Sequence, residues 1–186
     1  MRVLIAGYSK ELEVLTLEQG HELVGLVDPN TEISNNKFEI FKDDLFAIKK
    51  SRPEGFVNGI DNIKKKIFID SLYKKKNINP VNLIAGEIQN SSTYQDGFIL
   101  QHNGYVSVNC VIGRCVKINI SATIMHDVTI GDYSTIAPSA TILGRAKIGK
   151  RVYIGANSTI LPDLKIDDDV IIGAGSVVTK NIKSKS

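Results

Sequence analysis

The sequence predicts a small α/β domain over residues 1–85, followed by a parallel β-helix of six-residue repeats over residues 86–186. Three observations support this prediction. Strand-like and helix-like segments alternate up to about residue 80, aliphatic residues then recur at every sixth position, and glycine often follows them. A period of six excludes an α-helix, whose period is about 3.6 residues, and fits short strands separated by sharp turns.

The N-terminal segments alternate regularly in type. Each apolar run is bounded by turn residues, such as Gly20 after the first helix and Asp28-Pro29-Asn30 after the second strand. Strands that alternate with helices usually form a parallel sheet, so we expect a small parallel, Rossmann-like sheet. The expected elements are strand 3–6, helix 10–19, strand 23–27, helix 43–50, strand 56–60, helix 62–76 and strand 81–85.

The first strand ends at Gly7 and the second ends at Asp28, an order typical of half of a nucleotide-binding fold. The segment Gly7–Leu12 has one glycine where a dinucleotide fingerprint has three, which argues against a dinucleotide pyrophosphate site. Backbone N–H groups at the start of the first helix, near Ser9, could still hold one phosphate. We therefore expect a nucleotide-sugar site that is weaker than a dinucleotide site, with Ser9 and Asp28 as substrate-binding residues.

The six-residue repeat is nearly unbroken in the second half of the chain. We expect its aliphatic residues to point inward and to stack as a buried column, each coil covering the last. Small residues four positions later would fill the corners of a narrow interior, and glycine would supply the unusual backbone angles of the turns. The repeated positions are Ile112, Ile118, Ile124, Ile130, Ile136, Ile142, Ile148, Ile154, Ile160, Ile166, Ile172 and Val178.

Composition excludes several classes of protein. The net charge of +3 is too mild to require nucleic acid, and the lysine runs at 64–66 and 74–76 are expected to form the solvated face of one helix. No apolar run approaches the roughly 20 residues that span a bilayer, and the N-terminus lacks the features of a signal peptide. Cys110 and Cys115 form no metal-binding pattern and are expected to be buried and reduced in a cytoplasmic protein.

The repeat units resemble the hexapeptide repeat of the left-handed parallel β-helix, as in Ile130-Gly131-Asp132-Tyr133-Ser134-Thr135. Over nearly the whole chain the sequence is similar to bacterial nucleotide-sugar N-acetyltransferases and the related sialic acid O-acetyltransferases. The segment His126–Tyr133 matches the active-site segment of that family. The resemblance implies a homotrimer, with acetyl-CoA in the groove between adjacent β-helices and a nucleotide-linked sugar held by the N-terminal domain.

His126 is the strongest catalytic candidate. It lies two residues after the inward Ile124, at or near a turn, and an imidazole can remove a proton from an attacking amine or hydroxyl. By resemblance to the family, His126 is the general base and Asp127 its orienting acid. An exposed turn histidine without a catalytic role is the alternative, and it is our interpretation of His102, which also lies two residues after a ladder position.

Further site residues follow from spacing and resemblance. Gly144 follows His126 by three hexapeptide repeats, so it stacks at the same corner one coil later, where its N–H could bind the thioester carbonyl. The family implies that Asn119 lines the active site. Thr135 stands where many relatives have a second histidine, and its hydroxyl could bond the acetyl carbonyl. Ala156 and Ala174 match positions that contact the pantetheine arm of acetyl-CoA. No metal is expected.

Three functions remain open at this point. The first is acetyl-CoA-dependent N-acetylation of a nucleotide-linked amino sugar, such as a 4-amino-4,6-dideoxy sugar, for a surface glycan. The second is sugar O-acetylation of the sialic acid type, and the third is a non-catalytic β-helix scaffold. A β-helix with an intersubunit zinc site is disfavoured, because the three histidines are too few and too scattered.

Overall fold

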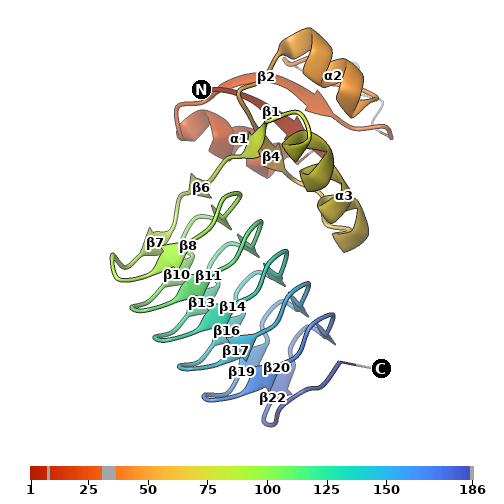
Figure 1. Ribbon diagram of the computed structural model, residues 1–186. Coiled ribbons are helices and arrows are strands. Elements are labelled where there is room, and N and C mark those ends of the chain that lie inside the picture. Colours follow the sequence, from red (N-terminus) through yellow and green to blue (C-terminus); the bar gives the residue numbers. More distant parts are fainter. Residues whose placement is uncertain (8, 31–36, 185–186) are drawn as a thin grey trace. The chain divides into compact units, whose positions relative to one another are not determined.

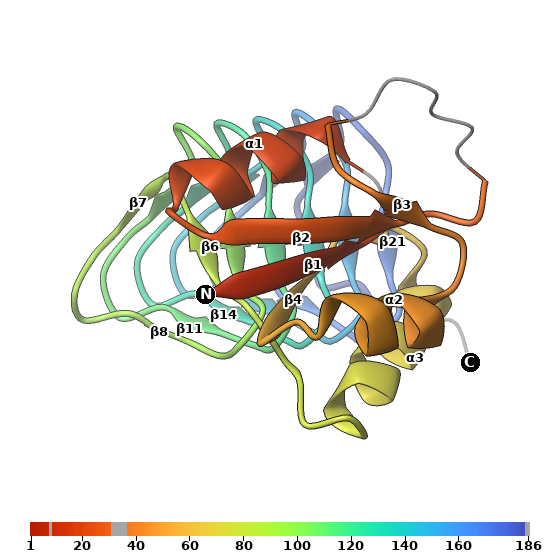
Figure 2. The ribbon, with the colours of Figure 1, turned by 90° about the horizontal axis from the view of Figure 1, so that it is seen from above.

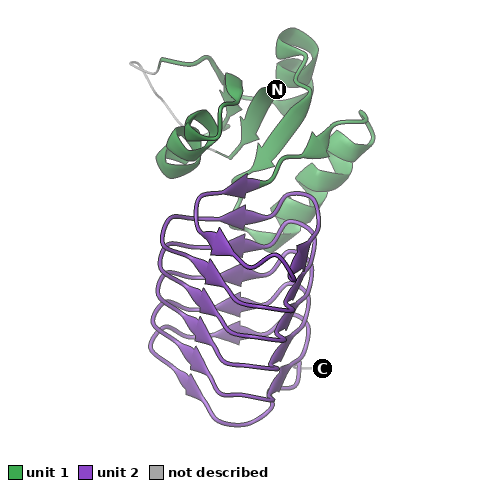
Figure 3. Cartoon of the chain, turned by 90° about the vertical axis from the view of Figure 1, so that its left-hand side faces the viewer, with its two compact units in different colours: residues 1–82 green, residues 83–186 purple. Residues whose placement is uncertain are grey.

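The computed structural model describes residues 1–7, 9–30 and 37–184. The chain forms two compact units, Met1–Asn82 and Leu83–Ser186 (Figure 3). We expected the division after residue 85. It falls earlier because β6 (Leu83–Ile84) pairs with β9 (Ile99–Leu100) and so already belongs to the β-helix. None of the described helices is long and apolar enough to cross a membrane.

Unit 1 contains a parallel five-stranded sheet in the order β3-β2-β1-β4-β5. The strands are β1 (Arg2–Ala6), β2 (Glu22–Val27), β3 (Ile40–Phe41), β4 (Gly55–Asn58) and β5 (Asn79–Pro80). Helix α1 lies on one side of this sheet, and α2 and α3 lie on the other (Figure 2). The parallel Rossmann-like sheet is confirmed. The prediction of a strand at 81–85 is confirmed in part: β6 (Leu83–Ile84) lies within that range, but it belongs to the β-helix, and the last strand of the unit 1 sheet is β5 at Asn79–Pro80.

Each helix in the described part of unit 1 begins after a polar residue that caps free N–H groups. The helices are α1 (Lys10–Glu18), α2 (Asp44–Ser51) and α3 (Ile63–Lys74). The side chain of Ser9 accepts a hydrogen bond from the N–H of Leu12, at 3.4 Å. Asp43 accepts from Phe46 N at 2.8 Å, and Asn62 accepts from Lys65 N at 3.1 Å. These caps satisfy N–H groups that have no partner inside the helix, which explains where each helix starts.

The core of unit 1 lies between the sheet and its helices. On the side of α2 and α3, Phe56 stacks on Tyr73 with ring centroids 4.1 Å apart, and both side chains are fully buried. The lysine run 64–66 departs from the expected solvated face, because Lys66 is buried. It lies three and seven residues before Ile69 and Tyr73, so helical geometry places it on the face that packs against the sheet.

Unit 2 is a parallel β-helix of two-residue strands stacked in three flat faces (Figure 1). Successive strands of one face are separated by one coil of three repeats, so Ile118 pairs with Ile136 and Ile136 with Ile154. Face 1 has the order β21-β18-β15-β12-β9-β6, face 2 has β22-β19-β16-β13-β10-β7, and face 3 has β20-β17-β14-β11-β8. The remaining strands are β7 (Glu87–Ile88), β8 (Thr93–Tyr94), β10 (Tyr105–Val106), β11 (Val111–Ile112), β12 (Lys117–Ile118), β13 (Thr123–Ile124), β14 (Thr129–Ile130), β15 (Thr135–Ile136), β16 (Thr141–Ile142), β17 (Lys147–Ile148), β18 (Tyr153–Ile154), β19 (Thr159–Ile160), β20 (Lys165–Ile166), β21 (Ile171–Ile172) and β22 (Val177–Val178).

The inward column of aliphatic residues is confirmed. Every repeated residue from Ile112 to Val178 is buried, and together they form one continuous hydrophobic cluster. Small residues fill the corners as expected, and the buried serines among them, Ser134 and Ser158, form hydrogen bonds to backbone carbonyls. Ser134 Oγ donates to the carbonyl of Gly149 at 2.9 Å and accepts from Val152 N at 3.0 Å. Cys110 and Cys115 are both buried, and neither is part of a disulfide.

The expectation that the repeat glycines supply the unusual backbone angles is wrong. A left-handed residue recurs every six positions, but it stands two residues after the position of the repeat glycine and is usually not glycine itself; examples are Asn109, Asp127, Arg145 and Asp163. The repeat glycines instead permit close approach of neighbouring coils. A Cβ on Gly131 would lie 2.7 Å from the carbonyl carbon of Gly149, a distance that backbone cannot tolerate.

Candidate functional site

His126 and Asp127 form a hydrogen-bonded pair at a corner of the β-helix. They follow β13 in the turn that leaves face 2, and we call the stack of these turns the His126 corner. Nδ1 of His126 lies 2.7 Å from Oδ2 of Asp127, and the two side chains are 39% and 45% exposed. Asp127 has a left-handed backbone, at φ 59°, and its carboxylate contacts the side chain of the preceding residue. Sequence neighbours therefore meet here, which the sequence left open.

Gly144 lies directly against the His126 ring, as the spacing of three repeats predicts. A Cβ on Gly144 would lie 2.6 Å from Cε1 and Nε2 of His126, and Arg145 N donates to the His126 carbonyl at 2.9 Å. The space that the missing side chain leaves is thus filled by imidazole. Gly144 is buried, and it allows His126 to lie flat over the next coil.

The carboxylate of Asp127 is held from two directions. Besides accepting from His126 through Oδ2, it accepts from Nδ2 of Asn109 through Oδ1 at 3.2 Å. The hydrogen bond to His126, and then that from Asn109, lower the pKa of Asp127 below its usual value. An ionised Asp127 bonded to Nδ1 fixes that nitrogen as the protonated one, which leaves Nε2 as the basic atom.

Asn119 and Thr135 lie apart from His126 within one chain. Both belong to face 1, Asn119 directly after β12 and Thr135 within β15. The side chain of Asn119 is buried, and its Nδ2 donates to the carbonyl of Ile136 at 2.7 Å. Thr135 is also buried. In a single chain, therefore, these two residues stabilise coil stacking and are not placed beside the catalytic pair.

Ala156 and Ala174 stack at a different corner, in the turns that leave face 1. Gly175 N donates to the carbonyl of Ala156 at 2.8 Å, which aligns the two turns one coil apart. Ala156 is half-buried and Ala174 is exposed. The residues expected to bind acetyl-CoA therefore occupy two corners of one β-helix, Gly144 at the His126 corner and the two alanines at the other.

Unit 1 contains a cavity of about 490 Å³ at the carboxyl ends of its strands. Gly7, Asp28 and Gly59 line it from the ends of β1, β2 and β4. From β1 the sheet grows in one direction through β2 and β3 and in the other through β4 and β5. Parallel α/β sheets bind ligands at such switch points, beyond the carboxyl ends of the strands. Of the two predicted residues, Asp28 lines the cavity and accepts from Asn30 N at 2.9 Å. The side chain of Ser9 is instead the cap of α1.

Sequence reasoning missed several residues of these sites. Asn109 precedes Asp127 by one coil, so the coil period could have identified it. Asp61, just before α3, and Lys65 and Phe68, within α3, also line the unit 1 cavity, and no sequence pattern distinguishes them from other polar or exposed residues. Among the described residues, no group of three or more His, Cys, Asp or Glu side chains could hold a metal ion.

Comparison with known proteins supports the repeat assignment and the fold. Residues 109–144 and 145–180 each match the bacterial transferase hexapeptide family (six repeats). No protein with a curated description matches the sequence significantly. Solved structures do match, at high structural similarity and low sequence identity.

Three of these structures illustrate the match. A histidine-to-asparagine mutant of perosamine N-acetyltransferase from Caulobacter crescentus, solved with CoA and GDP-perosamine, has a TM-score of 0.90 at 20% identity, covering 98% of this chain and 90% of that one. The acetyltransferase domain of PglB from Neisseria gonorrhoeae FA1090, solved with acetyl coenzyme A, has a TM-score of 0.87 at 18% identity, covering 97% and 92%. WeeI from Acinetobacter baumannii AYE has a TM-score of 0.79 at 21% identity, covering 98% and 93%.

These matches establish architecture over nearly the full length of the chain. Residues 109–180 match the bacterial transferase hexapeptide family, and the chain has the fold of the perosamine N-acetyltransferase and the PglB acetyltransferase domain, a left-handed β-helix preceded by an α/β unit.

Proposed function

We propose that the protein is an acetyl-CoA-dependent N-acetyltransferase that acts on a nucleotide-linked amino sugar. The observation that carries this proposal is the His126–Asp127 pair, bonded at 2.7 Å on an exposed corner with the imidazole seated over Gly144. Structural relatives were solved with CoA and GDP-perosamine, which supports the same substrate classes here. A histidine that merely filled a turn would not need a carboxylate partner.

The chemistry follows from the atoms of this pair. Nε2 of His126 accepts a proton from the sugar amine as the amine nitrogen bonds to the acetyl carbonyl carbon. The carbon–sulfur bond of the thioester breaks, and CoA leaves as a thiol when the His126 imidazolium passes that proton to the sulfur. Asp127 keeps Nδ1 protonated and stabilises the imidazolium that forms, as the carboxylate does in hydrolase triads. Gly144 N–H is proposed to bond the acetyl carbonyl oxygen.

The substrates would enter from two directions. The unit 1 cavity is proposed to hold the nucleotide, with Asp28 bonding a ribose hydroxyl. Acetyl-CoA is proposed to lie along a groove between β-helices, in contact with Ala156 and Ala174. Those alanines and His126 occupy different corners of one chain, and a groove between two copies would bring both kinds of corner to one ligand. This geometry supports the homotrimer, in which Asn119 and Thr135 of one copy would face the active site of the next.

The first experiment measures CoA release from acetyl-CoA by the purified protein. Acceptors are UDP-, dTDP- and GDP-linked 4-amino sugars and free sialic acid. We expect turnover on one nucleotide-linked amino sugar and a loss of roughly 10²–10⁴-fold in His126→Ala. His102→Ala is the matched control, because His102 also lies two residues after an inward aliphatic, Leu100, at a corner of the β-helix.

The outcomes separate the alternatives. Turnover only on sialic acid would replace N-acetylation with O-acetylation. No turnover on any acceptor, together with no binding of acetyl-CoA, would leave a non-catalytic scaffold. Equal losses in both histidine variants would contradict the assignment of His126 as the base.

A further inference from the structure

Four polar residues stack along the His126 corner, one per coil. Asn109, Asp127, Arg145 and Asp163 have left-handed backbones with φ between 58° and 62°. In each of the last three, the N–H donates to a carbonyl of the previous coil, at 2.9–3.1 Å. Consecutive coils lie about 4.8 Å apart. Arg145 therefore stands between two carboxylates, each one coil away.

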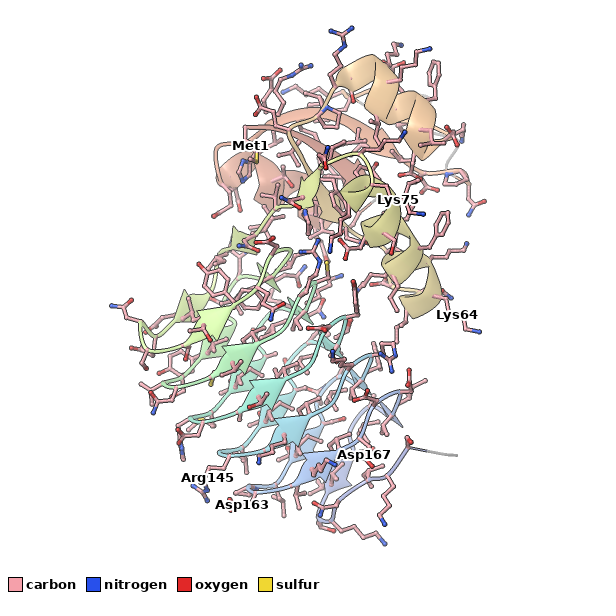
Figure 4. All side chains as sticks on the ribbon, viewed as in Figure 1. Met1, Lys64, Lys75, Arg145, Asp163 and Asp167 are labelled. Carbon is pink, nitrogen blue, oxygen red and sulfur yellow. The ribbon has the colours of Figure 1, made fainter. Side chains whose placement is uncertain are left out.

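Arg145 pairs with one of these carboxylates and not the other. Its Nε donates to Oδ1 of Asp163 at 2.6 Å, and its Nη2 donates to Oδ2 at 2.8 Å, so the guanidinium is bound in a bidentate manner. Figure 4 shows Arg145 and Asp163 side by side at one edge of the β-helix. Within the part of the chain that the structure describes, the carboxylate of Asp127 has His126 and Asn109 as its hydrogen-bond partners.

A guanidinium bound to Asp127 would compete with His126. Bidentate pairing uses both carboxylate oxygens, and the charge-assisted bonds that Arg forms are stronger than bonds from neutral donors. A carboxylate engaged in this way would orient the imidazole poorly. The donor on the opposite side, Asn109, is neutral and reaches Oδ1 alone at 3.2 Å, which leaves Oδ2 for Nδ1 of His126.

We propose that Asp163 is a positioning residue for the catalytic pair: by occupying the fork of Arg145, it keeps that guanidinium away from Asp127, so that Asp127 stays bonded to His126. This inference rests on the proposed function for its kinetic consequence. Its structural consequence, the state of the His126–Asp127 bond, can be measured without any substrate.

A second bidentate ion pair provides the control, although Arg151 also donates from Nη2 to Asp168 Oδ2 at 3.4 Å. Arg151 Nε donates to Asp169 Oδ1 at 2.6 Å, and Arg151 Nη2 donates to Asp169 Oδ2 at 2.8 Å, again across one coil. This pair lies in the turns that leave face 3, not at the His126 corner. If stacked ion pairs serve only to hold coils together, breaking either pair should have the same effect.

The test compares Asp163→Asn, Asp169→Asn, and Asp163→Asn combined with Arg145→Gln. We expect Asp163→Asn to lower kcat roughly 10-fold with little change in KM, a loss of the size typical of residues that orient an active group. The double variant, which has no guanidinium to misplace, should return to within about 2-fold of wild type. Asp169→Asn should keep wild-type kcat.

Nitrogen-15 NMR of the imidazoles supplies the second readout, and with three histidines the spectrum is assignable by His126→Ala. In wild type the neutral ring of His126 should carry its proton on Nδ1. Asp163→Asn should shift protons to Nε2, and the added Arg145→Gln should restore Nδ1–H.

Several results would overturn the inference. An unchanged tautomer in Asp163→Asn would do so, and so would a double variant that stays as impaired as the single one. Equal effects of the Asp163 and Asp169 variants would show that both ion pairs serve only to hold neighbouring coils together. If the protein shows no acetyl transfer while the tautomer shifts as expected, the proposed function fails and the positioning role of Asp163 stands.

Discussion

Replacing Gly144 with alanine should uncouple catalysis from stability. The added Cβ would lie 2.6 Å from Cε1 and Nε2 of His126 and 3.2 Å from Cδ2, so the ring must move. Ordinary contact begins at 3.4 Å, which requires a displacement of about 0.8 Å. Because Nδ1 is 2.7 Å from Asp127, a shift of that size away from the carboxylate takes the pair to about 3.5 Å, beyond hydrogen-bond distance.

The expected cost can be stated as a rate. A misplacement of about 1 Å in a catalytic group can lower the rate about 10²-fold, equivalent to about 2.7 kcal/mol of transition-state stabilisation. We therefore expect kcat/KM of Gly144→Ala to fall about 100-fold in the CoA-release assay. Stability should change little, since the side chain of His126 is 39% exposed and can move toward solvent.

Gly131→Ala is the matched control for this variant. Its Cβ would meet backbone of the next coil at 2.7 Å rather than a movable side chain, so the loss should appear in the unfolding midpoint. If Gly144→Ala retains wild-type kcat/KM, or loses activity only in proportion to lost stability, the contact between Gly144 and His126 does not matter for catalysis and the reasoning is refuted.

Three further predictions follow from other parts of the chain. Asp28→Asn should raise KM for the nucleotide sugar roughly 10-fold and leave KM for acetyl-CoA unchanged in steady-state kinetics, because a hydrogen bond to a charged group contributes about 1.5–3 kcal/mol; equal changes for both substrates would contradict the pocket assignment. Ile136→Ala should lower the free energy of unfolding by about 2–5 kcal/mol in urea titrations, whereas Ile171→Ala, at a side chain 74% exposed, should be nearly neutral. Burial raises the pKa of Asp44, which accepts a hydrogen bond from Tyr73 at 2.8 Å. Its contribution to stability is therefore present below the usual pKa of 3.8 and is lost as pH rises through the raised value. In denaturation curves, the stability of Asp44→Asn relative to wild type should increase over that pH interval, and a difference that does not change with pH would show that Asp44 does not titrate with folding.

The accuracy of prediction differs between the two halves of the chain. In the β-helix a single period fixed strand positions, inward residues and register, because each coil repeats the same local geometry and contacts mainly its neighbours. The same period placed Gly144 against His126. In unit 1 the helices agree with the structure to within two residues, but strand β3 was missed and the last strand was placed beyond Pro80. Such short strands depend on their neighbours in the sheet more than on their own residues.

The sequence by itself determined the architecture and the chemistry available to it. Eleven isoleucines at a spacing of six can be buried together only in stacked coils, and His126 beside Asp127 supplied a base with a carboxylate next to it. Only the tertiary structure decided which groups meet. The carboxylate of Asp127 proved to bond Nδ1 of His126, the glycines that directly follow the inward residues proved to be coil contacts rather than turn formers, and Asp163 proved to bind the guanidinium of Arg145. Those outcomes depend on side-chain directions across neighbouring coils, which spacing along the chain brings close but does not orient.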